Sequence, residues 1–187
     1  MENKVKDELK FIGLEKSIFK IKIDLQDKFM ENGMDIVQFY ISTNPGQPLK
    51  PLEKIVSGGE LSRIMLALKT VFVDKDKISS VIFDEIDTGI SGRIAQRTAE
   101  KMYAISKKHQ VLCVTHLPQI AAISDTHYLV LKDVHNNNTY TRIKKLNNEE
   151  KEHELAKMLG GSEVTEITLA HAKELIKMAD AKKKLYS

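Results

Sequence analysis

Several features are scarce in this sequence of 187 residues, and each absence excludes a class of protein. The single cysteine, Cys113, excludes an intramolecular disulfide framework and a zinc site built from several cysteines. Tryptophan is absent and aromatic residues make up only 6%, which disfavours a wide platform for stacking nucleobases. No apolar run approaches the roughly 20 residues that a membrane helix needs, and the polar residues 1–4 are not followed by the apolar region of a signal peptide. We therefore expect a cytoplasmic chain with no membrane partner.

Charge of one sign is also lacking. Lysine and arginine number 29 against 26 aspartates and glutamates, so the formal net charge is only +3. This mild excess does not by itself indicate a nucleic-acid partner. Hydrophobic residues make up 42%, which is enough to bury a core, and the length suits one domain or one domain with a small annex.

The N-terminal third alternates between helical and strand patterns. Residues 1–16 carry apolar side chains four and three positions apart, which predicts a short amphipathic helix. Strict alternation over 19–25 predicts a half-buried strand, and 36–42 predicts a second strand. Three prolines and a glycine fall within 45–51, which predicts an irregular loop.

The central part of the chain reads as a strand–helix–strand unit. Apolar residues follow the helical period over 61–72 and again over 94–105. The short apolar runs 81–83 and 111–114 predict strands buried on both faces. Two strands joined through a helix are expected to be parallel.

The last part of the chain predicts a hairpin followed by helices. Strand-like segments at 128–132 and 139–143 flank Asn136–Asn138, whose side chains suit a turn. From Asn148 onward the apolar residues return to the helical period. The fold class expected for the whole chain is α/β, with a mixed sheet and flanking helices.

The first candidate site lies at the start of the helix over 61–72. Ser57 and Glu60 have the spacing of a capping box, in which each side chain bonds the other residue's backbone. Gly58 and Gly59 would expose backbone N–H groups at the positive end of the helix, which suits an anion such as phosphate. Capping and anion binding both remain open on the residues alone.

The second candidate site is the acidic pair that follows the first buried strand. Charges are expected wherever a buried strand reaches water, so Asp84 and Glu85 need no special function. Ligands of α/β sheets nevertheless bind at the carboxyl ends of strands. There Asp84 would hold Mg²⁺, which takes few protein carboxylates and keeps several waters, and Glu85 would orient an attacking water, as nucleotide hydrolysis requires.

The third candidate is His116, at the carboxyl end of the second buried strand. If the two strands are neighbours, His116 shares a cleft with the acidic pair; otherwise it is a structural histidine. The remaining histidines show no metal-ligand spacing, and Cys113 lies in an apolar run that indicates packing. The phosphate-loop pattern G-x-x-x-x-G-K-[ST] is absent from the sequence.

Taken together, these three segments resemble the motifs of ABC-type ATPases. V-S-G-G-E-L-S-R (Val56–Arg63) is similar to their signature motif, and S-V-I-F-D-E-I-D-T-G-I-S-G (Ser80–Gly92) to their Walker B strand and D-loop. V-T-H-L-P-Q-I-A (Val114–Ala121) is similar to their switch-histidine segment. The amino-acid sequence of the last two segments resembles that of the RecN-like family of SMC-like bacterial DNA repair ATPases. This resemblance extends from about residue 17 to the end of the chain.

The resemblance implies that this chain is the C-terminal half of an ABC/SMC-type P-loop NTPase head. Residues 1–16 would be the end of a returning coiled-coil helix, and residues 17–187 the C-terminal lobe. The implied cofactors are ATP and Mg²⁺. The implied partners are the protein's own N-terminal segment with its Walker A loop, a second head in a homodimer, and DNA in the bacterial nucleoid.

The resemblance also implies a role for each matched residue. Asp84 would coordinate Mg²⁺ through water, whereas Glu85 and His116 would be catalytic. The residues expected to contact nucleotide are Ser57, Gly58, Gly59, Glu60, Thr88, Gly89 and Ser91. Many ABC proteins carry aspartate where this sequence has Ser91. Without a Walker A loop the chain is expected to be inactive alone, and the alternative is a non-catalytic ABC-like dimerisation or docking module.

Overall fold

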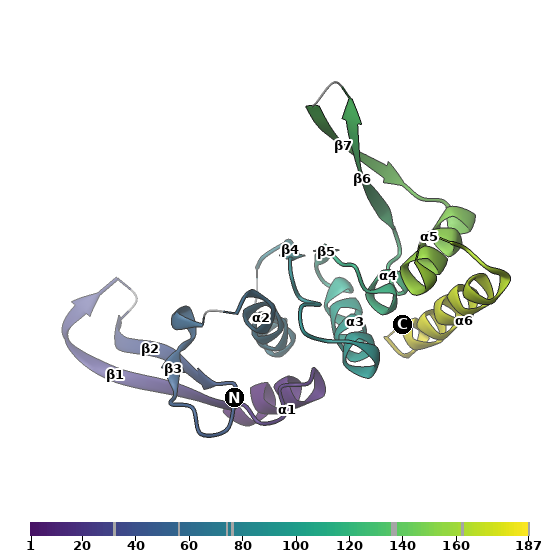
Figure 1. The fold of residues 1–187 in the computed structure, drawn as a ribbon. Helices are drawn as coiled ribbons and strands as arrows, with labels where there is room; N and C mark the ends of the chain where they lie inside the picture. Colours follow the sequence, from purple (N-terminus) through teal and green to yellow (C-terminus); the bar gives the residue numbers. More distant parts are fainter. Residues whose placement is uncertain are drawn as a thin grey trace. The chain divides into compact units, whose positions relative to one another are not determined.

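The chain forms two compact units, Met1–Val114 and Thr115–Ser187 (Figure 1). The computed structural model describes residues 1–31, 33–55, 57–73, 75, 77–135, 138–161 and 163–186. Val56 of the signature segment and the turn residues Asn136 and Asn137 lie outside the described residues.

The first unit contains helices and two small sheets. In chain order its elements are α1 (Glu2–Phe11), β1 (Ile18–Met30), β2 (Gly33–Ser42), β3 (Lys50–Pro51), η1 (Leu52–Lys54), α2 (Gly58–Phe72), β4 (Ser80–Phe83), α3 (Gly92–Ser106) and β5 (Gln110–Cys113). The strands β1, β2 and β3 form an antiparallel sheet, and β4 pairs with β5 in parallel. The predicted strand–helix–strand unit is therefore confirmed.

Helix α1 is amphipathic, as predicted, and packs against α2. Val5 and Leu9 lie on one face and are completely buried. Lys101 of α3 forms an ion pair of 2.6 Å with Glu8 on α1. A helix as short as α1 is marginal in isolation, so this packing against α2 and α3 is what stabilises it.

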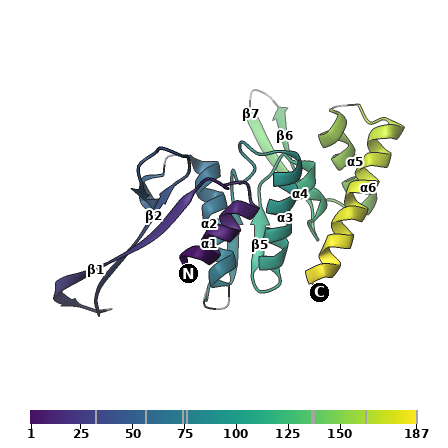
Figure 2. The same ribbon diagram turned by 90° about the horizontal axis from the view of Figure 1, so that it is seen from below.

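Strands β1 and β2 form a long antiparallel ribbon that extends away from α1 and α2 (Figures 1 and 2). Phe19 is paired with Ile41 at the end near the helices, and both side chains are buried. Farther along the same face, Ile23 is paired with Val37, and both are exposed. The half-buried character predicted for 19–25 therefore holds only at the start of the strand.

Strands β4 and β5 are buried on one face only, so the prediction of burial on both faces is wrong. Phe83 is 4% exposed, whereas its neighbour Ile82 is 70% exposed. Ile82 is paired with Leu112, and the next residue on that face, Val114, is also exposed. Helix α3 contacts β5, but within the described residues no element covers the face that carries these three side chains. We call Ile82, Leu112 and Val114 the bare face.

The second unit contains a hairpin and a helix pair. Its elements are α4 (Pro118–Ala122), β6 (Tyr128–His135), β7 (Asn138–Lys145), α5 (Asn148–Gly160), α6 (Glu166–Lys183) and η2 (Lys184–Tyr186). The antiparallel pairing of β6 with β7 confirms the predicted hairpin. Helices α5 and α6 lie side by side (Figure 2) and bury Leu155 and Ala172.

The α/β class expected from the sequence is confirmed, and the described residues divide the parallel and antiparallel pairs among three small sheets. None of the helices in the described part of the chain is both long and apolar enough to cross a membrane.

Candidate functional site

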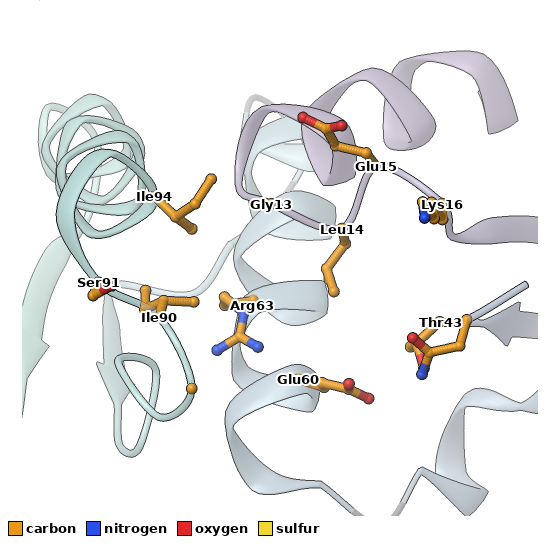
Figure 3. Close-up of a pocket in the computed structure, with 12 residues that line it drawn as sticks. Gly13, Leu14, Glu15, Lys16, Thr43, Glu60, Arg63, Ile90, Ser91 and Ile94 are labelled. Atoms are coloured by element: carbon orange, nitrogen blue, oxygen red, sulfur yellow. The ribbon is translucent and has the colours of Figure 1, made fainter.

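The start of α2 is capped by a side chain, as the sequence predicts. Ser57 is the N-cap, and its Oγ accepts a hydrogen bond of 3.4 Å from the backbone N–H of Glu60. The reciprocal bond of a capping box, in which the Ser57 N–H donates to the Glu60 carboxylate, is not formed in the described residues. Instead, the Glu60 side chain lines a cavity beside Thr43 (Figure 3).

The two glycines of the signature segment lie directly against the turn that follows β4. Gly58 sits beneath the carboxylate of Glu85, so closely that a β-carbon there would overlap Oε2. A β-carbon at Gly59 would lie 2.8 Å from the Thr88 β-carbon and 3.0 Å from the Glu85 carbonyl oxygen. Gly59 therefore requires glycine for close packing, whereas at Gly58 the obstacle is only the movable end of the Glu85 side chain. The sequence analysis considered neither contact.

The acidic pair occupies a strained turn. Glu85 has a φ of +55°, and it is the one non-glycine residue with positive φ among those described. Such a conformation costs about 1–3 kcal/mol and persists only where the surroundings enforce it. The Ser62 hydroxyl donates a hydrogen bond of 2.7 Å to the Asp84 carbonyl, and Asp84 Oδ1 accepts from the Glu85 N–H at 3.0 Å. Both carboxylates are exposed, which suits a cation that keeps most of its waters.

Arg63, to which the sequence analysis gave no role, fastens the same turn from α2. Its side chain is only 6% exposed, and Nη1 donates to the carbonyl oxygens of Ile86 at 3.2 Å and Thr88 at 2.7 Å. Burial lowers the pKa of the guanidinium, and the charge of Glu60 acts in the opposite direction. An arginine flanked by the buried apolar residues of an amphipathic helix was the signal in the sequence, because buried charges are rare unless paired.

The predicted D-loop residues Thr88, Gly89 and Ser91 lie in two different environments. Thr88 packs against Gly59. Gly89 and Ser91 line a cavity of about 570 Å³ together with Glu60, Arg63 and residues 13–16 (Figure 3). The structure thus brings the predicted signature and D-loop residues together within the first unit.

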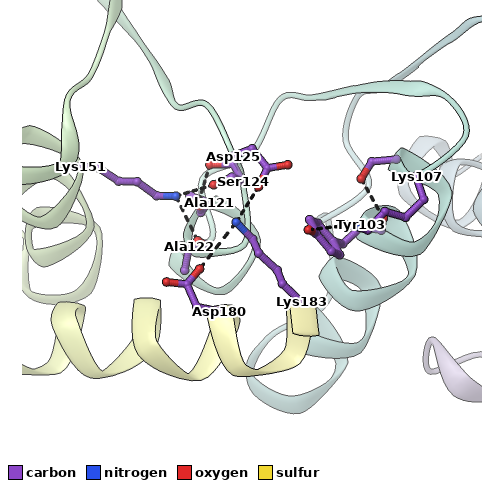
Figure 4. A network of polar contacts seen from close by, with 10 residues as sticks. Tyr103, Lys107, Ala121, Ala122, Ser124, Asp125, Lys151, Asp180 and Lys183 are labelled. Carbon is purple, nitrogen blue, oxygen red and sulfur yellow. Dashed lines mark hydrogen bonds and ion pairs between the residues drawn. The ribbon is translucent and has the colours of Figure 1, made fainter. Parts of the chain in front are cut away.

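His116 belongs to the second unit, so its approach to Asp84 and Glu85 stays a prediction. Its side chain is exposed and precedes α4. Lys151 holds the C-terminal end of α4 (Figure 4). Its Nζ donates to the carbonyl oxygens of Ala122 at 3.1 Å and Ser124 at 2.6 Å. The helix that follows His116 is therefore anchored to α5.

Cys113 is not a poised nucleophile. Burial raises the pKa of its thiol to about 12, and the negative charges of Asp87 and Asp84 act in the same direction. The thiol therefore stays protonated at neutral pH, in keeping with the predicted packing role. The described residues contain no group of three or more histidine, cysteine, aspartate or glutamate side chains able to hold a metal ion. The binding of Mg²⁺ by Asp84 stays a prediction.

Comparison with curated proteins identifies similar sequences. The chain is 50% identical over 179 residues to DNA repair protein RecN of Halalkalibacterium halodurans, a match that covers 94% of this chain and 32% of that protein. It is 45% identical over 195 residues to DNA repair protein RecN of Bacillus subtilis, covering 96% and 34% respectively. The chain therefore spans about a third of the length of these relatives. No protein-family model matches the chain.

Solved structures of SMC heads share the fold. The Smc head domain with a coiled coil and joint from Pyrococcus yayanosii matches with a TM-score of 0.56, covering 83% of this chain and 28% of that one. A structure from work on ATP-driven dimerization of SMC ATPases matches with a TM-score of 0.50, covering 84% and 90%. Sequence identities of 16% and 17% limit these matches to the fold, and the predicted SMC-type head fold is confirmed.

Proposed function

Because this chain is a RecN-type sequence over the segment that it shares with those relatives, we propose that it is the C-terminal part of an ATPase head that acts in DNA double-strand-break repair and recombination. In the intact protein, ATP bound between two heads would hold them together, and hydrolysis would release them. DNA would be the larger partner, and the protein would work in the cytoplasm at the nucleoid.

The observation that carries this proposal is the contact between the signature glycines and the acidic turn. Gly58 lies under the Glu85 carboxylate, and Gly59 lies against Thr88. These contacts hold the signature motif and the predicted catalytic carboxylate in a fixed relation within one chain. Here the two are packed together with no side chain between them.

Each predicted residue then has a chemical task. Exposed Asp84 at the end of β4 would support Mg²⁺ through water, since this cation is bound by one or two carboxylates and retains its waters. Glu85 would accept the proton of an attacking water, and His116 would contact the terminal phosphate. When bound, Mg²⁺ neutralises charge that develops on the phosphates.

The signature residues would serve the nucleotide of the opposite head. Ser57 and Gly58 are exposed at the positive end of α2, where backbone N–H groups attract phosphate. Glu60 and the D-loop residues Gly89 and Ser91 line one cavity beside this end of the helix. This arrangement supports a surface that closes over a nucleotide held by another chain.

The protein's own N-terminal segment would supply the phosphate loop and cover the exposed apolar surface of this unit. The bare face belongs to the parallel pair β4–β5 and is apolar and exposed, whereas parallel sheets are normally covered on both faces. The outer half of the β1–β2 ribbon also carries exposed apolar side chains. We therefore expect the isolated chain neither to bind ATP tightly nor to hydrolyse it.

A non-catalytic docking module remains the alternative, since such a module would also lack a phosphate loop. The two functions predict different results when the N-terminal segment is added. A head part should gain ATP binding and hydrolysis when joined to that segment, whereas a docking module should gain neither.

The test combines this chain with the N-terminal segment of the same protein and measures ATP affinity, turnover and ATP-dependent dimerisation. The proposal expects all three to appear in the assembled head and to be absent from the isolated chain. Ser57→Arg should preserve ATP binding by one head and prevent dimerisation, because it places bulk and charge at the exposed end of α2. Micromolar ATP binding by the isolated chain, or an assembled head that never hydrolyses ATP, would contradict the proposal.

A further inference from the structure

We propose that Arg63 is a positioning residue, which locks the signature helix and the D-loop of one head into a single rigid surface. The consequence for two heads rests on the proposed function, whereas the lock itself is a property of this chain. Arg63 would thus set the angle at which the D-loop meets the opposite head, without touching nucleotide itself.

The two hydrogen bonds that Arg63 makes to the described residues both run to the turn that follows β4. Nη1 bonds the carbonyl oxygens of Ile86 and Thr88, two residues apart, so a single nitrogen fixes both ends of the bend. Its buried Nε makes no hydrogen bond to the described residues. The two carbonyl bonds are therefore what orient the buried guanidinium, and through it the turn.

A second contact from α2 prevents the turn from pivoting about Arg63. Gly59, one helical turn earlier on α2, packs against the Thr88 β-carbon and the carbonyl oxygens of Glu85 and Thr88. Ser62 adds a hydrogen bond to the Asp84 carbonyl. Contacts from α2 thus reach the turn before, at and after the strained residue Glu85, and together they would hold it in one orientation.

Lysine is not expected to replace this arginine fully. A guanidinium presents several donors in a rigid plane, whereas an ammonium is a compact and strongly hydrated charge on a flexible stem. Hydrogen bonds to charged groups are the stronger class, and a buried carbonyl that loses its donor bears the cost of desolvation. The carbonyl oxygens of Ile86 and Thr88 should therefore become accessible to water when Arg63 is replaced by a shorter or uncharged side chain.

The first experiment tests the lock on the chain itself by amide hydrogen exchange. The informative amides are those of Thr88 and Ile90, whose N–H groups bond the carbonyl oxygens of Glu85 and Asp87. Arg63→Gln should accelerate their exchange about tenfold or more, from the loss of charge-assisted hydrogen bonds, and Arg63→Lys should give a smaller increase. The matched control is Arg97→Gln, which removes an arginine that stacks on Phe11 and bonds its carbonyl; there the two amides should keep their rates.

A measurement on the unaltered chain keeps the proposal testable if Arg63→Gln does not fold. The Arg63 guanidinium should give a distinct, slowly rotating ¹⁵N signal, with through-bond couplings to the Ile86 and Thr88 carbonyls. A freely rotating Arg63 side chain, or unchanged exchange at Thr88 and Ile90 in a folded Arg63→Gln variant, would overturn the lock.

The second experiment tests the consequence in the head assembled with its N-terminal segment. Arg63→Gln should leave ATP affinity of a single head within about twofold and weaken ATP-dependent dimerisation at least tenfold, with partial rescue by Arg63→Lys. Equal losses of affinity and dimerisation would mean a purely structural role and would overturn the proposal. If the unaltered assembled head does not bind ATP, the proposed function fails, while the exchange data still decide on the lock.

Discussion

The carboxylate of Glu85 lies over the α-carbon of Gly58, with no room for a β-carbon between them. Gly59, the next residue, faces the backbone of the same turn. The two glycines therefore meet different kinds of atoms. At Gly58 the obstacle is the end of a flexible side chain, whereas at Gly59 it includes backbone carbonyl oxygens that cannot turn away.

We accordingly predict that alanine destabilises the chain at Gly59 but not at Gly58. Gly58→Ala should leave the free energy of unfolding nearly unchanged, because Glu85 can rotate and alanine favours the helix by about 1 kcal/mol, but it should reduce turnover in the assembled head. Gly59→Ala should destabilise the chain by about 1–3 kcal/mol, the usual cost of overpacking. Urea unfolding of both variants checks the stabilities, and equal stability losses would contradict the prediction.

The acidic pair should separate catalysis from binding in the assembled head. Glu85→Gln should preserve ATP binding and lower turnover by about 10²–10⁴-fold, the usual contribution of a positioned acid–base group. Asp84→Asn should instead weaken Mg²⁺-dependent binding, since a hard cation loses anionic support. Affinity and turnover measured side by side give the contrast. If Glu85→Gln hydrolyses ATP at the parent rate, the acidic pair is merely solvated charge.

Local patterns allowed most elements to be predicted. Helical spacing of Val5 and Leu9 gave α1, and strand alternation with a polar turn gave the β6–β7 hairpin. Burial was harder to predict, because it depends on what lies against a strand. Ile82 has the sequence environment of a strand covered on both sides, yet its face is exposed in this chain.

The candidate site was predicted in its members but not in its construction. The motifs identified Gly59 and Glu85, but the sequence suggested phosphate as the reason for glycine, whereas the structure shows a close approach of Thr88 as well. The role of Arg63 depends on carbonyl oxygens 23 and 25 residues away. The apolar neighbours of Arg63 in the sequence indicate its burial, but only the fold reveals which carbonyl oxygens it bonds.

The bare face should drive self-association of the isolated chain. Exposed sheet surface of this kind favours pairing with another chain. Ile82→Lys should shift the chain toward monomer, as measured by light scattering over a range of concentrations. Ile167→Lys is the matched control, because Ile167 is also an exposed isoleucine but lies on α6. The Ile167→Lys variant should associate as the parent chain does. A strictly monomeric parent chain at high concentration would contradict this expectation.

Lys151 should make stability depend on pH in a window set by its own pKa. Burial, followed by the like charge of Lys183, lowers the pKa of Lys151 from 10.5 to about 8, although Asp180 and Asp125 act in the opposite direction. Between these two values the unfolded chain binds more protons than the folded chain, so the contribution of Lys151 to stability rises with pH. Below pH 8 the cost of burying the charged ammonium is fully present.

The test compares the parent with Lys151→Met by urea unfolding from pH 7 to pH 10. The free energy of unfolding of the parent minus that of the variant should increase by roughly 1–2 kcal/mol between pH 8 and pH 10. This increase is smaller than the full pKa shift would give, because the side chain is partly solvated. Titration of Cys113 is present in both proteins and cancels. Lys157→Met, which removes an exposed ammonium from the same helix, is the matched control variant. If the stability difference between the parent and Lys151→Met does not change with pH, Lys151 keeps an ordinary pKa. In that case its hydrogen bonds to Ala122 and Ser124 do not remove the ammonium from water.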